Sequence, residues 1–207
     1  FDELTPKEYE DARKSVLDSF FTLPAIIDGI YEALEKFGFK GGNLLEPAMG
    51  VGNFVGKMPS EMAENTHVYG VEIDSISGRI AKQLYPDADI QVTGFEHTNF
   101  QNGSFDVAVG NVPFGDLNFP DKQYGTTKLH DFFFAQTLDK VKDGGIVAFV
   151  TSKGTLDKKD ESFRKQLAEK ADLIGAIRLP NNAFKANAGT EVTSDIIFLQ
   201  KRSAPPE

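Results

Sequence analysis

The sequence predicts an α/β protein built around a doubly wound, parallel β-sheet. Short segments rich in β-branched residues alternate with amphipathic helical segments along most of the 207 residues. That alternation indicates strands joined by crossover helices, with helices covering both faces of the sheet. The expected strands are Asn43–Leu45, Val68–Ile73, Ile90–Thr93, Phe105–Gly110, Ile146–Thr151, Leu173–Arg178 and Asp195–Gln200. The expected helices between them are Phe54–Glu64, Ile76–Leu84, Phe132–Val141 and Ser162–Ala171.

Two further helices are expected ahead of the first strand. Apolar residues recur at helical spacing over Tyr9–Phe20. Leu23-Pro24 then opens a second helix, which Gly38 ends. Its apolar face consists of Ile26, Ile27, Ile30, Ala33, Leu34 and Phe37.

Length and composition limit the possible functions. A chain of 207 residues forms one large domain, or one domain with a small appendage. No apolar run approaches the ~20 residues of a membrane span and no signal-peptide pattern is present, so we expect a cytoplasmic protein without membrane attachment. Cysteine is absent and the three histidines (His67, His97, His130) show no ligand spacing, so no metal site is expected. The net charge of -9 opposes a nucleic-acid partner, because polyphosphates are usually bound by a basic patch.

The first strand runs into a turn, Glu46–Gly52, that is placed to hold a ligand. In a doubly wound sheet this first strand-to-helix turn lies against the ligand, and Gly50 and Gly52 let the backbone approach it. Glu72 ends the second strand twenty residues after Gly52, where a carboxylate can accept both hydroxyls of a ribose. As alternatives, the glycines serve only a tight turn, and Glu72 or Asp74 caps the next helix.

Together these motifs resemble the cofactor motifs of class I S-adenosylmethionine-dependent methyltransferases, in particular those that act on the amino group of DNA adenine. The motifs are Glu-Pro-Ala-x-Gly-x-Gly-x-Phe, starting at Glu46, and Gly-Val-Glu-Ile-Asp, starting at Gly70. The resemblance implies that the backbone around the glycines holds the methionine part of the cofactor. It further implies that the acidic residue binds the ribose and that the next side chain packs on the adenine. The residues implied on this chain are Glu46, Pro47, Ala48, Gly50, Gly52, Glu72 and Ile73.

Two shorter segments extend this resemblance. Phe21-Thr22-Leu23-Pro24 is similar to a Thr-Pro element that touches the cofactor carboxylate, which implies a binding role for Thr22. Thr22 is equally consistent with an N-cap ahead of Pro24. Gly94-Phe95-Glu96 stands where the family has a short acidic motif for the cofactor's adenine amino group, which implies Glu96, although Phe95 is equally consistent with ordinary core.

The strand ending in Asn111-Val112-Pro113-Phe114 is expected to carry the chemistry. An amine such as adenine N6 is a poor nucleophile, because its lone pair is delocalised into the ring. Two acceptors that bind its N–H groups localise that lone pair, and the Asn111 side-chain carbonyl and the Val112 main-chain carbonyl are the candidates. Pro113 stiffens the turn, and Phe114 offers a ring for stacking a flipped-out base. Catalysis would then rest on positioning and electrostatics.

This tetrapeptide resembles the Asn/Asp-Pro-Pro-aromatic motif of the same family, with Val112 in place of the first proline. Because the acceptor at that position belongs to the main chain, valine is compatible with activity. The resemblance also places Asn111 beside the cofactor. The alternative is a strand-ending turn in which Asn111 and Pro113 are only turn residues.

The resemblance continues almost to the end of the chain. His130-Asp131-Phe132-Phe133 opens a helix, Lys142–Val150 is the turn and strand after it, and Arg178–Phe184 with Thr193–Leu199 resembles the closing hairpin of restriction-system modification subunits. The implied fold is a Rossmann-like class I methyltransferase, α/β, with a mostly parallel seven-stranded sheet and helices on both faces.

Three other segments are candidates for the edge of the site. Asp131 and Phe132 border the cofactor or base pocket, or else they are an N-cap and a core residue. Phe184 and the Lys185–Glu191 loop are candidates for the edge of the substrate site. The long connection Pro113–His130 has no clear periodicity and is expected to be a functional loop. The residues of this connection that are expected to contact a target strand are Lys122, Tyr124 and Lys128.

The resemblance implies transfer of a methyl group from S-adenosylmethionine to an exocyclic amino group, most directly adenine N6 in DNA. It is closest to large modification enzymes of phages and mobile elements, in which this domain sits beside a helicase. The alternatives are a protein glutamine-amide methyltransferase, an RNA-base methyltransferase and a catalytically silent S-adenosylmethionine-binding module. We expect residues 1–40 to form a helical segment on the cofactor side, 41–203 the catalytic domain and 204–207 the start of a linker. The chain is expected to belong to a longer polypeptide that reaches DNA through a separate specificity domain or subunit.

Overall fold

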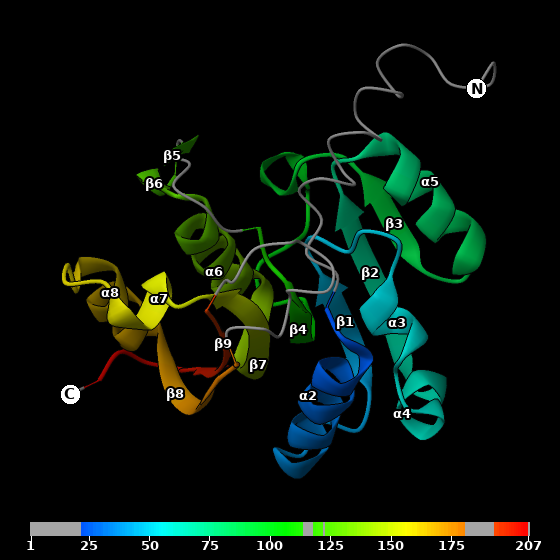
Figure 1. Ribbon diagram of the computed structural model, residues 1–207, viewed down its shortest axis with the longest axis horizontal. Helices are drawn as coiled ribbons and strands as arrows, with labels where there is room; N and C mark the ends of the chain where they lie inside the picture. Colours follow the sequence, from blue (N-terminus) through cyan, green and yellow to red (C-terminus); the bar gives the residue numbers. More distant parts are fainter. Residues whose placement is uncertain (1–21, 114–117, 122, 181–192, 207) are drawn as a thin grey trace.

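The computed structural model describes residues 22–113, 118–121, 123–180 and 193–206. Within them, seven strands form one sheet in the order β3-β2-β1-β4-β7-β9-β8 (Figure 1). Every pairing in this sheet is parallel except those of β9, which runs antiparallel to β7 and β8. The strands are β1 (Gly42–Glu46), β2 (Thr66–Glu72), β3 (Asp89–Val92), β4 (Phe105–Asn111), β7 (Val141–Ser152), β8 (Ala171–Arg178) and β9 (Ser194–Lys201). The mostly parallel seven-stranded sheet is confirmed, and β8 and β9 pair antiparallel at its edge, while residues 181–184 of the expected closing hairpin lie outside the described residues.

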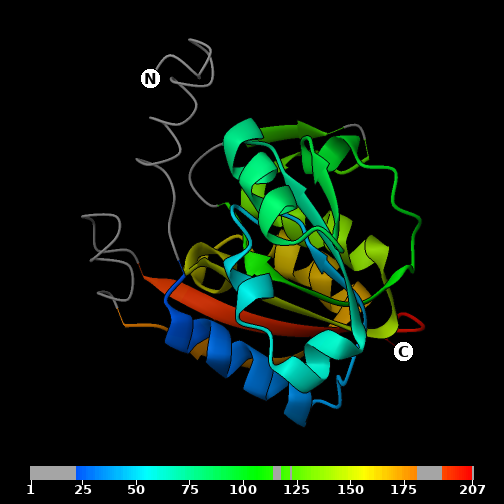
Figure 2. The ribbon, with the colours of Figure 1, turned by 90° about the vertical axis from the view of Figure 1, so that its right-hand side faces the viewer.

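Helices cover both faces of the sheet. On one face α2 (Pro24–Lys36), α3 (Asn53–Gly56) and α4 (Ser60–Glu64) contribute buried apolar side chains to one core cluster. On the other face α6 (Leu129–Lys140) and α8 (Ser162–Lys170) contribute to a second cluster. The helix α5 (Ser75–Leu84) packs on β2 and β3. Figure 2 shows α2, in blue, lying along the red strand β9.

The strand β7 shows why the central segments are continuously apolar. Its residues Ile146, Ala148 and Val150 belong to the α2-side core, whereas Val147 and Phe149 belong to the α6-side core. All five are buried, because each face of the strand meets a helix layer.

Two expected elements differ from the structure. The single helix expected over Phe54–Glu64 is two short helices, α3 and α4, with Pro59 at the N-cap of α4. A proline disfavours helical backbone at the residue before it, so the helix cannot continue through Met58. The second difference lies in the Pro113–His130 connection, where β5 (Asn118–Asp121) and β6 (Gly125–Lys128) form an antiparallel hairpin and α6 begins at Leu129.

Helix starts can be compared with the expected caps. Leu23 is the N-cap of α2 and makes no side-chain cap hydrogen bond, so the interpretation of Thr22 as N-cap is wrong. Asp74 is the N-cap of α5, and its carboxylate accepts a hydrogen bond from the Ser77 N–H at 2.7 Å, as expected. The helix expected over Tyr9–Phe20 lies outside the described residues. None of the described helices is long and apolar enough to cross a membrane.

Candidate active site

The carboxyl ends of β1, β2 and β4 lie at one edge of the sheet, because these strands are parallel. They end at Glu46, Glu72 and Asn111 respectively. The chain order reverses between β1 and β4, which is the switch point where doubly wound sheets bind ligands. An ideal Cβ on Gly110 would lie 3.8 Å from both Glu46 Cγ and Pro47 Cδ. The expected cofactor turn and the expected catalytic strand are therefore neighbours.

The turn after β1 is held against β2 by two hydrogen bonds. The Met49 N–H donates to the Val71 carbonyl at 3.0 Å, and the Gly50 N–H donates to Glu72 Oε2 at 2.7 Å. Gly50 and Gly52 both have positive φ, 56° and 88°. A Cβ on Gly50 would meet nothing within 4 Å, whereas one on Gly52 would lie 2.4 Å from the Tyr85 ring. The first glycine therefore faces open space, and the second faces the ring of Tyr85.

Glu72 fastens this turn to β2. Its Oε1 accepts the Asp74 N–H at 2.7 Å while its Oε2 accepts the Gly50 N–H. A carboxylate has about four acceptor positions, so these hydrogen bonds do not exhaust its capacity to accept from a ligand's hydroxyls. Burial raises the pKa of Glu72 above its ordinary value, and these backbone hydrogen bonds partly oppose that rise. Because Asp74 caps α5, the interpretation of Glu72 as that cap is not needed.

Glu46 is the most unusual carboxyl group at this edge. It is 1% exposed, and its Oε2 has no hydrogen-bond partner among the described residues. Burial first, and then the nearby Glu72 carboxylate, raise the pKa of Glu46 well above its ordinary value. A buried acceptor without a donor is costly unless a ligand supplies one. The ammonium group of S-adenosylmethionine is a donor of the required kind.

Other cofactor candidates also fit an S-adenosyl group. Ile73, at the end of β2, is 74% exposed, as expected for an apolar side chain that a ligand's ring would cover. Glu96 is half-buried just after β3, which pairs with β2, and its carboxylate folds back against Gly94. Phe95 is 2% exposed and belongs to the core, as its alternative interpretation proposed. Of the remaining cofactor candidates, Thr22 and Pro47 are buried and Ala48 is half-buried.

Asn111 is the last residue of β4 and lies level with Val150 of β7. The Val112 N–H donates to the Val150 carbonyl at 3.1 Å, so the ladder continues one residue beyond the strand. Proline, the family residue at this position, has no such N–H. The Val112 side chain is buried, Pro113 is exposed and Phe114 lies outside the described residues. The last two residues before the turn are thus anchored to β7.

Asp131, an expected candidate for the edge of the site, forms a buried pair in the first turn of α6 with His130, to which the sequence motifs gave no chemical role. His130 Nε2 is 3.3 Å from Asp131 Oδ1, and both side chains are less than a tenth exposed. Burial raises the pKa of Asp131 to about 6. Lys128, and not Asp131, is the N-cap of α6, so that alternative is wrong, while Phe132 is fully buried core. The candidates Lys122, Phe184 and Lys185–Glu191 lie outside the described residues.

Tyr124 has a structural contact. Its hydroxyl donates to Asp139 Oδ2 at 2.6 Å, and its ring lies 6.0 Å from that of Phe132. The Phe119 ring lies 4.4 Å from the Phe132 ring. These contacts seat the β5–β6 hairpin on α6.

The fold is that of the class I methyltransferases. A protein from Listeria monocytogenes, described as a "putative class I S-adenosylmethionine-dependent methyltransferase", superposes with a TM-score of 0.74 at 21% identity, over 90% of this chain and 63% of that protein. The family model for N-6 DNA Methylase matches residues 3–206, and the chain belongs to this family.

Two curated relatives show how the chain compares with longer proteins. It is 34% identical over 195 residues to "Defense against restriction protein B" of Escherichia phage P1, covering 91% of this chain and 8% of that protein. It is 26% identical over 191 residues to "Type I restriction enzyme EcoEI methylase subunit" of Escherichia coli, covering 78% of this chain and 38% of that subunit. The chain therefore spans less than half the length of either relative.

Proposed function

We propose that this chain transfers a methyl group from S-adenosylmethionine to the N6 amino group of adenine in DNA. The observation that carries the proposal is the position of Asn111, which follows Gly110 at the strand end beside Glu46 and Pro47 of the cofactor turn. Family membership supports adenine N6 as the acceptor.

Each end of the site has its own task. The turn around Gly50 receives the methionine part of the cofactor, Glu46 accepts its ammonium group, and Glu72 accepts the ribose hydroxyls. Ile73 and Glu96 hold the adenine ring and its amino group. When bound, the cofactor supplies an electrophilic methyl group on a sulfonium. Glu46 and Glu72 are the last residues of β1 and β2, and the other groups lie within four residues of a strand end, so little reorganisation is needed.

Asn111 and Val112 act on the acceptor. The Asn111 side-chain carbonyl and the Val112 main-chain carbonyl accept the two N–H groups of adenine N6, which localises the nitrogen lone pair. The hydrogen bond from the Val112 N–H to Val150 holds this segment against β7. Pro113 and Phe114 are proposed to shape the turn and to stack on the flipped-out base.

The first test is Asn111→Ala in the full-length protein. We expect loss of methyl transfer to DNA by at least about 100-fold, the usual scale for removing one oriented polar group, with cofactor binding by calorimetry retained. Gln83→Ala, which removes an exposed amide on α5, is the matched control and should leave transfer unchanged. Retained transfer in the Asn111 variant would contradict the proposed mechanism.

The second test identifies the acceptor. The full-length protein is incubated with labelled S-adenosylmethionine, and DNA, RNA and protein are separated. Label in DNA, at adenine N6, is expected. The net charge of -9 favours a protein acceptor as second candidate, a glutamine amide, and label only in protein would establish it instead. Cofactor binding without transfer to any acceptor would indicate a silent binding module.

The remaining proposals concern the whole protein. Because the chain spans 8% and 38% of its two curated relatives, we propose that it works within a larger cytoplasmic polypeptide or assembly. The DNA sequence would then be read by a separate specificity domain or subunit. Residues 41–203 are proposed as the catalytic domain, 1–40 as a helical segment on the cofactor side and 204–207 as the start of a linker.

A further inference from the structure

The segment from β7 into α8 concentrates positive charge in an acidic chain. Residues 153–165 contain five basic and three acidic side chains, whereas the whole chain carries a net charge of -9. The basic residues are Lys153, Lys158, Lys159, Arg164 and Lys165. The segment includes the short helix α7 (Gly154–Asp157).

This segment leaves the sheet beside the proposed catalytic residue. Asn111 of β4 is level with Val150 of β7, and the two strands are parallel. Lys153 comes three residues after Val150, which at the rise of a strand is about 10 Å along the chain. The segment therefore starts at the same carboxyl edge as the Asn111 turn.

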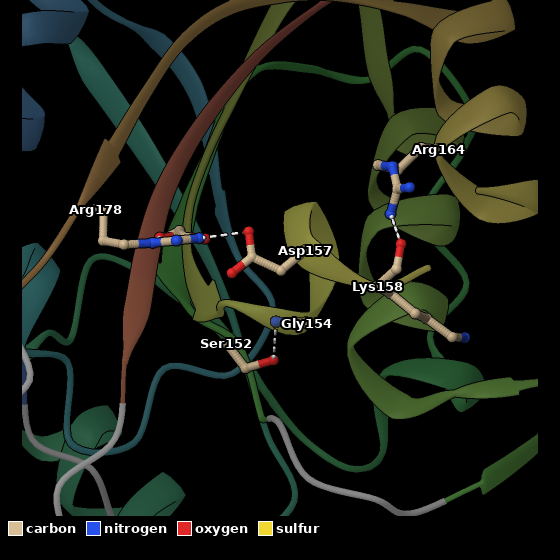
Figure 3. Close-up of polar contacts among 7 residues, drawn as sticks. Ser152, Gly154, Asp157, Lys158, Arg164 and Arg178 are labelled. Atoms are coloured by element: carbon tan, nitrogen blue, oxygen red, sulfur yellow. Dashed lines mark hydrogen bonds and ion pairs between the residues drawn. The ribbon is translucent and has the colours of Figure 1, made fainter. Parts of the chain in front are cut away.

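Most of the carboxylates in the segment are already engaged. Arg178 Nη2 donates to Asp157 Oδ1 at 2.8 Å (Figure 3), and Arg178 also holds the buried Asp195 at 2.9 Å. Glu161 is paired with Lys165 at 2.8 Å. Asp160 accepts the Ser162 N–H at 3.0 Å at the start of α8.

Three lysines remain without such a partner. Lys153, Lys158 and Lys159 are exposed and form no ion pair within the described part of the chain. The backbone at Lys153 and Lys158 is nevertheless fixed, because Arg164 Nη1 donates to the Lys158 carbonyl at 2.7 Å (Figure 3) and the Lys153 N–H donates to the Thr193 carbonyl at 3.1 Å. Cations on a fixed backbone, beside a catalytic strand and facing solvent, suit an extended polyanion.

We propose that Lys153, Lys158 and Lys159 bind phosphodiester groups of the DNA that carries the target adenine. This inference rests on the proposed function and assigns a surface to its substrate. It also answers the objection raised by the acidic composition, because a local basic segment at the site is sufficient to neutralise a few phosphates. Such contacts position the strand and carry no base specificity.

The test compares two double variants of the full-length protein, Lys158→Gln/Lys159→Gln and Lys40→Gln/Lys82→Gln. Lys40 lies just before β1 and Lys82 in the last turn of α5, both toward the amino edge of the sheet. Binding of a fluorescent DNA duplex is measured by anisotropy between 50 and 200 mM salt. Each lost phosphate contact reduces the slope of log affinity against log salt by about 1, so we expect the first variant to lose about 2 and to bind about 10- to 100-fold more weakly. The control variant should keep the parent slope.

The outcomes separate this inference from the proposed function. If the parent methylates DNA but the Lys158/Lys159 variant keeps its salt slope, the surface assignment is wrong and the function stands. An equal loss in the control variant also overturns the assignment, because it would show a general charge effect. If the parent neither binds nor methylates DNA, both are wrong. Thermal unfolding and cofactor binding of each variant, expected to match the parent, exclude misfolding as the cause.

Discussion

The Tyr85 ring makes Gly52 the most sensitive position in the cofactor turn. An alanine Cβ there would lie 2.4 Å from Tyr85 Cε2 and 3.0 Å from Cδ2, and the backbone φ is 88°. The left-handed backbone costs about 1–2 kcal/mol for a residue with a Cβ, and overpacking against the ring adds about 1–3 kcal/mol. The alanine also reduces the conformational entropy of the unfolded chain, which stabilises the folded state by about 0.4–1 kcal/mol. We therefore expect Gly52→Ala to lower the free energy of unfolding by about 2–4 kcal/mol.

Gly50→Ala is the matched control for this change. Its φ is 56°, and a Cβ there would meet nothing within 4 Å. Only the backbone contribution remains, so the expected loss is about 1 kcal/mol, or about 2–4 °C in melting temperature. Both variants are measured by urea unfolding without cofactor.

A double-mutant cycle isolates the contact with Tyr85. In a Tyr85→Ala background the ring is gone, so Gly52→Ala should cost only about 1 kcal/mol, as at Gly50. If Gly52→Ala costs the same with and without the ring, or no more than Gly50→Ala, the packing argument is refuted.

Two further predictions concern buried carboxyl groups. Burial raises the pKa of Asp131 to about 6, so the stability it contributes is fully present below pH 3.8 and is lost as the pH rises to about 6. The side chain of the Asp131→Asn variant is neutral throughout, so the free energy of unfolding of this variant should exceed that of the parent by about 1–2 kcal/mol at pH 7.5 and match it near pH 3.5, after allowance for partial solvation. Urea unfolding across this pH range measures the difference, and the control variant Asp143→Asn should show none that depends on pH. A difference for Asp131→Asn that does not change with pH would contradict this reasoning. Arg178 donates to both oxygens of Asp195, which is 1% exposed, so Arg178→Ala should lower the free energy of unfolding by about 2–4 kcal/mol. Asp157→Ala removes only the surface partner of Arg178 and should cost at most about 1 kcal/mol, and equal losses for the two variants would contradict this account.

The sequence predicted correctly those elements that depend only on residues close together in the chain. The strand β7 is apolar on both faces, so its segment indicated a buried strand without any tertiary information. Asp74 was foreseen as a cap because capping depends on residues three apart. The break between α3 and α4 also had a local signal, Pro59, which the helical spacing of Phe54–Glu64 obscured.

The features that escaped prediction depend on residues distant in sequence. The hairpin strands β5 and β6 have four residues each, too few for an alternating pattern, and the contact of Phe119 with Phe132 seats them on α6. Tyr85 lies against Gly52 although the two are 33 residues apart in the sequence. The Glu72 carboxylate raises the pKa of Glu46 from a position 26 residues away in the sequence. No local pattern encodes contacts between residues so far apart in the sequence, although Glu72 and Asn111 were expected at strand ends and are found there.

The contacts around Arg178 also determine how the ends of β8 and β9 are held together. The Leu179 N–H donates to the Ser194 carbonyl at 2.9 Å, so the two strand ends that flank residues 181–192 are already joined. Closing a longer chain between fixed ends costs only about 0.6 kcal/mol for each doubling of its length. We therefore expect that inserting residues between Leu179 and Ser194 would cost little loop-closure free energy, because the strand ends stay joined by this main-chain hydrogen bond and by the Arg178–Asp195 ion pair. For engineering, the junction of β8 and β9 is therefore a position where an inserted segment should leave the pairing of these two strands intact.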